Sequence, residues 1–483
     1  MFLIVFLDGL RPDQVTEWHT PNLLRLARRG VRFLSHHAAF PTETRVNVAS
    51  LVTGCYPSRH GIVGNAFYLL DQEEPWQVDT GDRLSLAHLD KETGGHALLR
   101  ESLGEILGQV DQRMASVVVG SSGNAFLHNH KAENDGGLII HPQFTIPASY
   151  AEELEHRFGT WSSAEVPNSA WMHHATTVLL EYVIPKYDPA VASLWFSEPD
   201  STQHKTGISS PQALRGIEEA DAELGRVMEY LEAKGLEAST DILVASDHGH
   251  SSVTQTIDVA EELVKAGLKE RRDSTEVLVA ASGGCALIYV LDSDQEKVEA
   301  IAHFLMAQSW CGPLFTSSPI PGSFPLSLIH GQNPRAPDIL MSFSWGNSRN
   351  SQGVRGGAVF AKGGTSVGSG NHGSISPYEI HSVLMAAGPH FKRGLQESIP
   401  SGSVDLLPTI LHILGLTTSE AVDGRVLFES LVEGPDPEDV FVETEVYQTT
   451  AKVVDAVFQQ NLQISKVEST LYLDKGKALR FSE

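Results

Sequence analysis

The sequence predicts an α/β fold with a mostly parallel central sheet and helices on both faces. Continuous apolar runs stand at residues 2–7, 114–119, 190–196 and 242–245. Such runs are typical of parallel strands that are buried on both faces. Segments with helical spacing of apolar residues separate them, which is the alternation that α/β folds require. Three of the runs end in acidic residues, at the sheet edge where open α/β sheets collect their ligand-binding side chains.

The first forty residues predict a β-α-β unit with very short links. Thr20 and Pro21 provide an N-cap and a first-turn proline, and Gly30 ends the helix that they start. Residues 31–34 then begin a second strand.

The next segment, residues 40–65, contains the first candidate for chemistry. Thr42 and Thr44 stand just before an apolar run that predicts a helix. A hydroxyl at a helix N-terminus faces unpaired N–H groups and the positive end of the helix dipole, which favours an anion there. This arrangement suits a nucleophile that attacks a phosphoryl group. A threonine in this position is more often only an N-cap, so the assignment depends on the rest of the chain.

The remaining elements continue the alternation, with one interruption. Helices are predicted at 102–110, 171–183, 211–235 and 404–414. Residues 125–165 lack clean periodicity and predict an excursion near the site. Residues 270–350 read as short strands and one helix, which predicts a smaller α+β cap inserted into a catalytic core made of 1–269 and 351–483. The last fifty residues mix strand and helix signals, and no role is assigned to them.

Composition narrows the class of partner. The 483 residues carry 35 Lys+Arg and 60 Asp+Glu, a formal net charge of −25, so the surface repels nucleic acid polymers and anionic membranes. An odd set of cysteines without paired spacing (Cys55, Cys285, Cys311) argues against a disulfide framework and for a reducing compartment. The N-terminal apolar run is short and has no basic flank, so it predicts a strand and not a signal peptide. We expect a cytoplasmic enzyme without a membrane span, and a homodimer is compatible with the sequence.

Candidate metal ligands follow the predicted strands in a fixed order. Asp200 and His204 stand four residues apart, close enough to share one ion. Asp247 and His248 follow a strand end, where a bend of the chain turns both towards one site. His372 is flanked by glycines, which leave room for a substrate. The full set of candidates is Asp8, Thr44, Asp200, His204, Asp247, His248 and His372.

Each of these residues also has a structural interpretation. An Asp at a strand end is often only a turn former, and most of the 21 histidines must be ordinary, among them His36 and His128. The combination and its order, and not any single motif, predict a metal site.

The motifs that carry these residues resemble a known family. They are LDGLRPD, TPNLLRLARRG, FPTETRVN, VTGCYPSRHGIVGN, SEPDSTQHKTG, ASDHGHSS and SGNHGS. In this order they resemble the alkaline phosphatase superfamily, specifically its type I phosphodiesterase/nucleotide pyrophosphatase branch, which includes phosphonoacetate hydrolase. The resemblance covers residues 2–255 and 355–415 and implies an alkaline-phosphatase-like three-layer core.

The resemblance also implies roles for the candidate residues. It implies a two-zinc site in which one ion is held by Asp8, Asp247, His248 and the Thr44 oxygen, and the other by Asp200, His204 and His372. It makes Thr44 the nucleophile and Thr42 a structural neighbour, and it matches Asn65 to a side chain that donates to a phosphoryl oxygen.

The chemistry of these residue types agrees with that implication. Carboxylates and imidazoles suit zinc, and manganese also fits. A threonine hydroxyl on a divalent ion loses its proton readily, which leads to a phosphothreonine intermediate. Two divalent ions would also create an attractive site for a small phosphorylated or phosphonate substrate on a repulsive surface.

One string is misleading, and two positions, Arg45 and Val46, depart from the family pattern; Val46 stands where nucleotide-cleaving members usually have Pro before Asn. Cys55 begins a C-x-P-S-R string like that of sulfatases, but the sulfatase cysteine precedes the Thr-Gly pair by nine residues, where this chain has Thr44; Cys55 is therefore interpreted as a small buried residue. Arg45 replaces the aromatic residue that usually follows the nucleophile in nucleotide-cleaving members. It offers a planar fork for a carboxylate or a second phosphate, and a solvent-facing arginine is the other interpretation. Asn124 and Lys131 lie where phosphonoacetate hydrolase places substrate-binding lysines, and are further candidates.

Three hypotheses about function follow. The first is a two-metal hydrolase of a phosphodiester or pyrophosphate bond. The second is a hydrolase of the C–P bond in a small phosphonate, and Arg45 favours it modestly. The third is a metal-dependent isomerase or mutase on the same scaffold.

Overall fold

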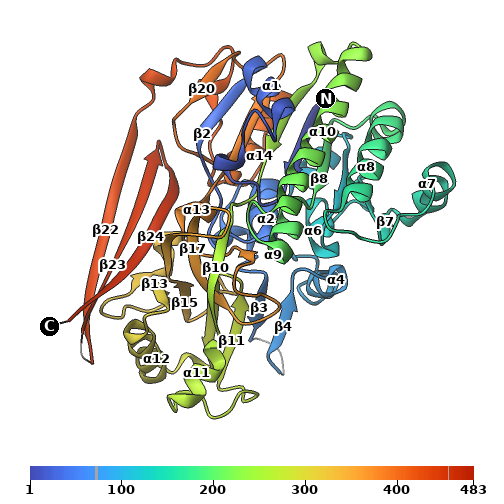
Figure 1. The fold of residues 1–483 in the computed structure, drawn as a ribbon. Coiled ribbons are helices and arrows are strands. Elements are labelled where there is room, and N and C mark those ends of the chain that lie inside the picture. The colour runs from blue at the N-terminus through green and yellow to red at the C-terminus, as the bar shows by residue number, and fades with distance from the viewer. Residues whose placement is uncertain (71–73, 455, 483) are drawn as a thin grey trace.

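The computed structural model describes residues 1–70, 74–454 and 456–482, and is built around one large sheet (Figure 1). Parallel strands form the centre of this sheet, in the order β9, β1, β8, β5. Their bounds are Asp241–Ala245 for β9, Phe2–Leu7 for β1, Val191–Phe196 for β8 and Met114–Val119 for β5. These strands are the four apolar runs of the sequence, so the predicted fold class is confirmed.

Shorter strands and antiparallel pairings complete the two sides of the sheet. Beyond β9, the antiparallel strand β19 (His381–Ala387) leads to β2 (Val31–His37), which also pairs with β20 (Leu395–Glu397) and β21 (Ser401–Gly402). Beyond β5 stand β6 (Leu138–His141) and the antiparallel β7 (Phe144–Ile146). Because β19 runs opposite to both β9 and β2, β2 points in the same direction as β1, and the first β-α-β unit forms as predicted.

Helices cover both faces of the sheet, because side chains alternate along each buried strand. Ile4 and Phe6 of β1 belong to one apolar core, and Val5 and Leu7 belong to the other. The first core includes side chains of α2 (Thr44–Thr53), α5 (Leu103–Gly108) and α14 (Leu406–Leu414); the second includes side chains of α1 (Pro21–Arg29), α8 (Ser169–Val178) and α10 (Pro211–Ala233). The core is therefore three-layered. No helix in the described part of the chain combines the length and the apolar character needed to cross a bilayer.

Residues 125–165 contain regular elements that the sequence did not reveal. They hold most of α6 (Ser122–His128), then β6, β7 and α7 (Ala151–Phe158). Every α6 residue from Gly123 to His128 is buried, so this helix has no polar face and shows no amphipathic period. The hairpin β3 (Ala66–Leu69) and β4 (Trp76–Asp79) lies below α6 in Figure 1, with the helix α4 (Arg83–Glu92) beside it.

Two smaller sheets lie below the main one in Figure 1. One is five-stranded, in the order β11-β12-β15-β13-β14, and packs on α12 (Gln295–Ala307). Its strands are β11 Val277–Ser282, β12 Cys285–Val290, β13 Cys311–Thr316, β14 Phe324–Pro325 and β15 Ile339–Phe343. The other contains β16 (Trp345–Arg349), β17 (Arg355–Ala361), β10 (Ser251–Ile257) and β18 (Gly370–Asn371). The five-stranded sheet falls inside residues 270–350, and the division of the chain into core and cap stays a prediction.

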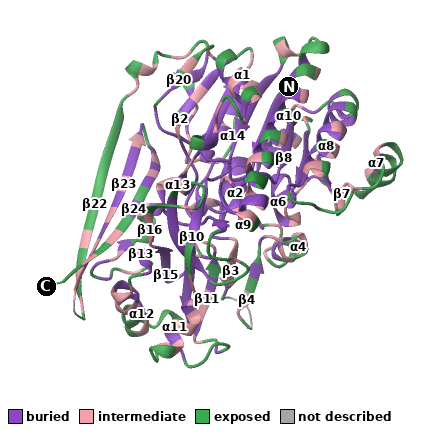
Figure 2. Ribbon diagram, in the orientation of Figure 1, coloured by how far each residue is buried: buried purple, intermediate pink, exposed green. Residues whose placement is uncertain are grey.

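The C-terminal residues form a third, antiparallel sheet and not a mixture of strand and helix. Its strands are β22 (Val442–Val453), β23 (Ala456–Val467) and β24 (Thr470–Ser482). β22 is the outermost strand, and its first seven residues are exposed, as Figure 2 shows. Because both faces of this half-strand meet solvent, its sequence lacks the apolar alternation that marks a strand.

Candidate metal centre

The predicted ligands come together at the carboxyl ends of adjacent strands. Asp8 follows β1, Asp200 follows β8 and begins α9 (Asp200–Thr206), and Asp247 follows β9. Since β9, β1 and β8 are neighbours and parallel, their carboxyl ends meet at one edge of the sheet. Thr44 joins them from the first turn of α2, and His372 from the residue after β18.

One half of the cluster contains Asp8, Asp247 and His248, whose ligand atoms all lie within 4.8 Å of one another. His248 Nε2 is 3.1 Å from Asp247 Oδ2 and 3.7 Å from Asp8 Oδ1. The Thr44 hydroxyl oxygen is 3.2 Å from the same nitrogen. We call this set, with Thr44, the Thr44 half.

The other half contains Asp200, His204 and His372, again within 4.8 Å. His204 Nε2 lies 3.2 Å and His372 Nε2 3.6 Å from Asp200 Oδ1. We call this set the Asp200 half. The rings of His248 and His372 stack at 3.7 Å between centroids, so the two halves are in direct contact.

Backbone carbonyls orient two of the imidazoles. His372 Nδ1 lies 2.8 Å from the Thr42 carbonyl and His248 Nδ1 2.9 Å from the Gly249 carbonyl. Each Nδ1–H therefore donates to a carbonyl, which leaves the Nε2 lone pair directed at the cluster. In this tautomer His248 Nε2 faces Asp247 Oδ2 with two lone-pair atoms opposed, an arrangement that a cation between them would stabilise.

Unpartnered carboxylate oxygens test whether the residues fit metal ions. Within the described residues, Asp8 Oδ1, Asp200 Oδ1 and Asp247 Oδ2 are buried and accept no hydrogen bond. On two of these residues the other oxygen is supported, since Trp195 Nε1 donates to Asp8 Oδ2 at 3.1 Å and the Gly9 N–H to Asp247 Oδ1 at 3.1 Å. Buried charge without a partner is costly, so the open oxygens of the three carboxylates fit a metal site.

The two halves differ in their electrostatics. Burial, followed by the charges of Asp247 and Asp200, raises the pKa of Asp8 well above its usual value. Burial alone would also raise the pKa of Asp200, but neighbouring histidines, His204 first, hold it well below its usual value. The Thr44 half thus has an excess of negative charge, and the Asp200 half is rich in imidazole.

The residues around Thr44 have distinct roles. The Thr42 hydroxyl donates to the Ser374 carbonyl at 2.8 Å and accepts from the Gly373 N–H at 3.0 Å, which agrees with its interpretation as a structural neighbour. Burial raises the pKa of Glu43 to about 8, which favours the neutral form of this carboxyl beside the hydroxyl. Thr44 is therefore the hydroxyl that faces the cluster.

Of the predicted substrate-binding residues, two carry open polar atoms. Both amide atoms of buried Asn124 and the Nε of half-buried Arg45 lack hydrogen-bond partners in the described ranges, as does Asn65 Oδ1. Asn124 packs against Gly120 together with the ring of Trp195, which donates to Asp8. These atoms are available to a ligand.

Lys131 differs, because its ammonium donates to both oxygens of Asp90, at 2.7 and 2.9 Å. It is half-buried in this ion pair, and the structure gives no support to a role in substrate binding.

Sequence reasoning did not single out His250. Its ring is completely buried, and its Nε2 lies 3.4 Å from Asp200 Oδ1. The ASDHGHSS motif contains this residue, two positions after His248, but residue spacing alone does not show that the chain turns it towards Asp200.

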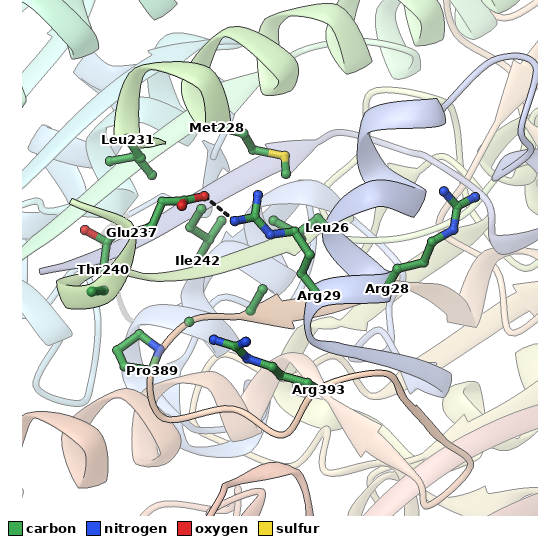
Figure 3. A pocket seen from close by; sticks show the side chains of 13 residues that line it. Leu26, Arg28, Arg29, Met228, Leu231, Glu237, Thr240, Ile242, Pro389 and Arg393 are labelled. Atoms are coloured by element: carbon green, nitrogen blue, oxygen red, sulfur yellow. Dashed lines mark hydrogen bonds and ion pairs between the residues drawn. The ribbon is translucent and has the colours of Figure 1, made fainter. Parts of the chain in front are cut away.

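A cavity of about 540 Å³ lies at the opposite, amino end of the sheet (Figure 3). Leu231 and Ile242 line it, and Arg28, Arg29 and Arg393 stand at its rim. Arg29 is paired with Glu237 there. This cavity is separate from the candidate metal ligands, because Ile242 is the second residue of β9 and Asp247 follows the end of that strand.

Comparisons with known proteins agree with this architecture. The family model described as type I phosphodiesterase / nucleotide pyrophosphatase matches residues 2–374. Ectonucleotide pyrophosphatase/phosphodiesterase family member 7 of Rattus norvegicus is 24% identical over 427 residues, covering 88% of this chain and 85% of the relative. The bis(5'-adenosyl)-triphosphatase of Bos taurus is 24% identical over 425 residues, covering 86% and 78%.

A solved structure supports the fold. Murine ectonucleotide pyrophosphatase/phosphodiesterase 5 is 20% identical, with a TM-score of 0.63, covering 88% of this chain and 97% of that one. An inactive variant of the murine protein has been solved in complex with AMP.

Proposed function

The chain belongs to the type I phosphodiesterase/nucleotide pyrophosphatase family, and on that premise we propose that it is a two-metal hydrolase of phosphodiester or pyrophosphate bonds with Thr44 as its nucleophile. The observation that carries the proposal is the position of the Thr44 hydroxyl, 3.2 Å from His248 Nε2 and beside carboxylate oxygens that no described group satisfies.

The reaction is a double displacement at phosphorus. Two divalent ions, when bound, would lower the pKa of the Thr44 hydroxyl and offset charge on the phosphoryl oxygens. The Thr44 oxygen forms a bond to phosphorus, the bond to the leaving oxygen breaks, and phosphothreonine results. Water then attacks this phosphorus and releases a monoester with the free Thr44 hydroxyl.

The residues around Thr44 position the substrate. Asn124 Nδ2 is an unpartnered donor for a phosphoryl oxygen, and the Asn65 amide nitrogen would donate to another, as the family resemblance implies. The first-turn N–H groups of α2 add a favourable dipole for an anion. Arg45 would bind a second anionic group of the substrate through its planar fork.

Zinc is the ion we assign to both halves, with manganese as the alternative, since both bind carboxylate and imidazole together. A chelator should abolish turnover, and zinc or manganese should restore it, with about two ions per chain in the active protein. Full activity in excess chelator would contradict the proposal.

A substrate panel separates the candidate reactions. We expect turnover of bis(p-nitrophenyl) phosphate and of a nucleotide p-nitrophenyl ester to exceed that of p-nitrophenyl phosphate and phosphonoacetate. AMP bound to the murine neighbour supports a nucleotide substrate. The C–P hydrolase remains the second candidate, because Arg45 could bind the carboxylate of a phosphonate, and phosphonoacetate as the best substrate would select it. A mutase would return phosphate to the substrate, so release of a monoester to water argues against it.

Assembly and location stay predictions from the sequence. A homodimer would be detected by light scattering of the purified chain. The expected cytoplasmic location would be tested by cell fractionation.

A further inference from the structure

We propose that His250 is a fourth protein ligand in the Asp200 half, so that this half holds its ion with one carboxylate and three imidazoles. The inference rests on the two-metal site proposed above and adds a ligand to it.

The distances around Asp200 carry the argument. Asp200 Oδ1 has His204 Nε2 at 3.2 Å, His250 Nε2 at 3.4 Å and His372 Nε2 at 3.6 Å. Donors that bind zinc tetrahedrally at about 2.0–2.1 Å lie about 3.3–3.4 Å from one another. All three distances lie close to that edge length, and the His250 distance matches it best.

The three rings are also arranged evenly. Centroid separations are 5.0 Å for His204 and His250, 5.1 Å for His204 and His372, and 5.3 Å for His250 and His372. The rings therefore form a nearly equilateral triangle, with a nitrogen of each close to the same carboxylate oxygen. The ligand atoms of His250, Asp200 and His248 also lie within 4.8 Å of one another, but the His248 centroid is farther from His250, at 5.8 Å. Because His248 serves the Thr44 half, we assign His250 to the half that contains Asp200.

Hydrogen bonding does not account for the position of His250. Its side chain is fully buried, yet neither ring nitrogen has a hydrogen-bond partner among the residues that the structure describes. An imidazole in a protein interior normally satisfies its nitrogens, so a ligand role for Nε2 explains an otherwise unfavourable placement.

Two glycines make room for the ring in this position. A Cβ at Gly9 would lie 2.8 Å from His250 Nδ1, and one at Gly370 would lie 2.9 Å from His250 Cδ2. The Arg11 guanidinium also donates to the His250 carbonyl at 3.0 Å. Close packing on both sides thus directs Nε2 at Asp200.

With His250, each half would have four protein ligands, but one ligand of the Thr44 half is the reacting hydroxyl itself. Zinc sites whose four protein ligands take no part in the chemistry are closed and retain their ion. The Asp200 half would therefore hold its ion more tightly than the Thr44 half.

Chelator competition on zinc-loaded protein tests this without measuring activity. Wild-type protein, His250→Ala and His250→Gln are titrated with a chelator of known zinc affinity, and the retained zinc is measured by mass spectrometry. We expect the Kd of the tighter ion to rise about 100-fold or more in both variants. His128→Ala, which removes a histidine as deeply buried but packed against Phe6 and Trp195, should leave the Kd unchanged.

His204→Ala separates failure of this inference from failure of the proposed function. If it weakens the tighter ion and the His250 variants do not, His250 is not a ligand and the two-metal site stands. If wild-type protein holds no zinc, or His204→Ala leaves its affinity unchanged, the proposed site itself is wrong.

Cobalt-substituted wild-type protein gives a second measurement that needs no variant to fold. With one equivalent of Co²⁺, which fills the tighter site, hyperfine-shifted proton NMR signals from three ligating imidazoles support the proposal. Signals from only two imidazoles overturn it.

Discussion

Strand β9 has an Asp–His pair at each end, and the two pairs are built differently. At the amino end, Asp241 is fully satisfied, because Oδ1 accepts the His390 N–H at 3.1 Å and Oδ2 lies 2.7 Å from His390 Nδ1. The His390 side chain is 54% exposed. At the carboxyl end, Asp247 Oδ2 faces the Nε2 lone pair of buried His248 at 3.1 Å.

The volume of a cavity does not show which end of β9 carries the candidate metal centre. The cavity of about 540 Å³ lies at the amino end, under an arginine rim (Figure 3). The opposed lone pairs lie at the carboxyl end, and they, rather than a cavity or an Asp–His pair, identify where a cation is needed. Each prediction below tests this distinction.

Thr44→Ala should have the largest effect, since it removes the nucleophile from the carboxyl end. We expect turnover to fall by about 10⁴-fold or more, with the zinc content still near the wild-type value because carboxylates and imidazoles supply most of the ligands. Thr53→Ala on the same helix is the control, as its hydroxyl bonds only to backbone, donating to the Ala49 carbonyl and accepting from the Cys55 N–H. Retained activity in Thr44→Ala would refute the nucleophile assignment.

The two aspartates of β9 provide a matched pair. Asp247→Asn should lose one bound ion and lower turnover by about 100-fold or more, because the amide cannot supply the charge that the ligand set requires. Asp241→Asn should keep both ions and normal turnover, and lose only about 1 kcal/mol of stability from its weakened hydrogen bonds. Metal analysis and thermal unfolding of both variants measure the difference. Equal metal loss in the two would show that the contrast between the ends is wrong.

His128, a buried histidine outside the candidate metal centre, tests whether an open nitrogen alone makes a cation site. His128 Nε2 has no partner in the described part of the chain, and burial lowers the pKa of His128 to about 3. Below pH 6.5 the unfolded chain takes up a proton that the folded chain does not, so the free energy of unfolding falls as the pH drops from 6.5 towards 3.

At pH 5 this single histidine accounts for about 2 kcal/mol of lost stability. His128→Leu should therefore be less sensitive to acid by about that amount, without any change in zinc content. Denaturant titrations at pH 7 and pH 5 measure both chains. An identical pH dependence would show that His128 is not held neutral by burial.

The sequence located the central strands and most of the proposed ligands for one physical reason. Buried parallel strands are continuously apolar, so their ends are visible, and Asp8, Asp200 and Asp247 stand at those ends. Elements that lack one buried and one exposed face were not predicted. Examples are α6, which is buried on all sides, and the first half of β22, which is exposed on both faces.

The spacing of residues in the sequence also does not show which residues far apart in the chain contact one another. Asp90, 41 residues from Lys131, engages the lysine that looked available for a substrate. His250 faces Asp200, 50 positions earlier in the chain. Both facts depend on how the chain folds back on itself, and so they appeared only with the structure.

The smallest predicted effect compares Arg45 with Lys131, the two cationic candidates for substrate binding. Arg45 Nε is buried and has no partner within the described ranges, and Arg45 directly follows the proposed nucleophile. Lys131 is neutralised by Asp90.

Arg45→Met should therefore raise KM about 10-fold for a substrate with a second anionic group, with kcat nearly unchanged, since it removes binding that ground state and transition state share. Lys131→Met should change either constant by less than about 2-fold, because an ion pair made within the protein contributes little to a ligand. Steady-state kinetics on the same substrate decide the matter. If Lys131→Met raised KM as much as Arg45→Met, the substrate would extend to the Asp90 ion pair, and the binding site would be larger than the open polar atoms around Thr44 indicate.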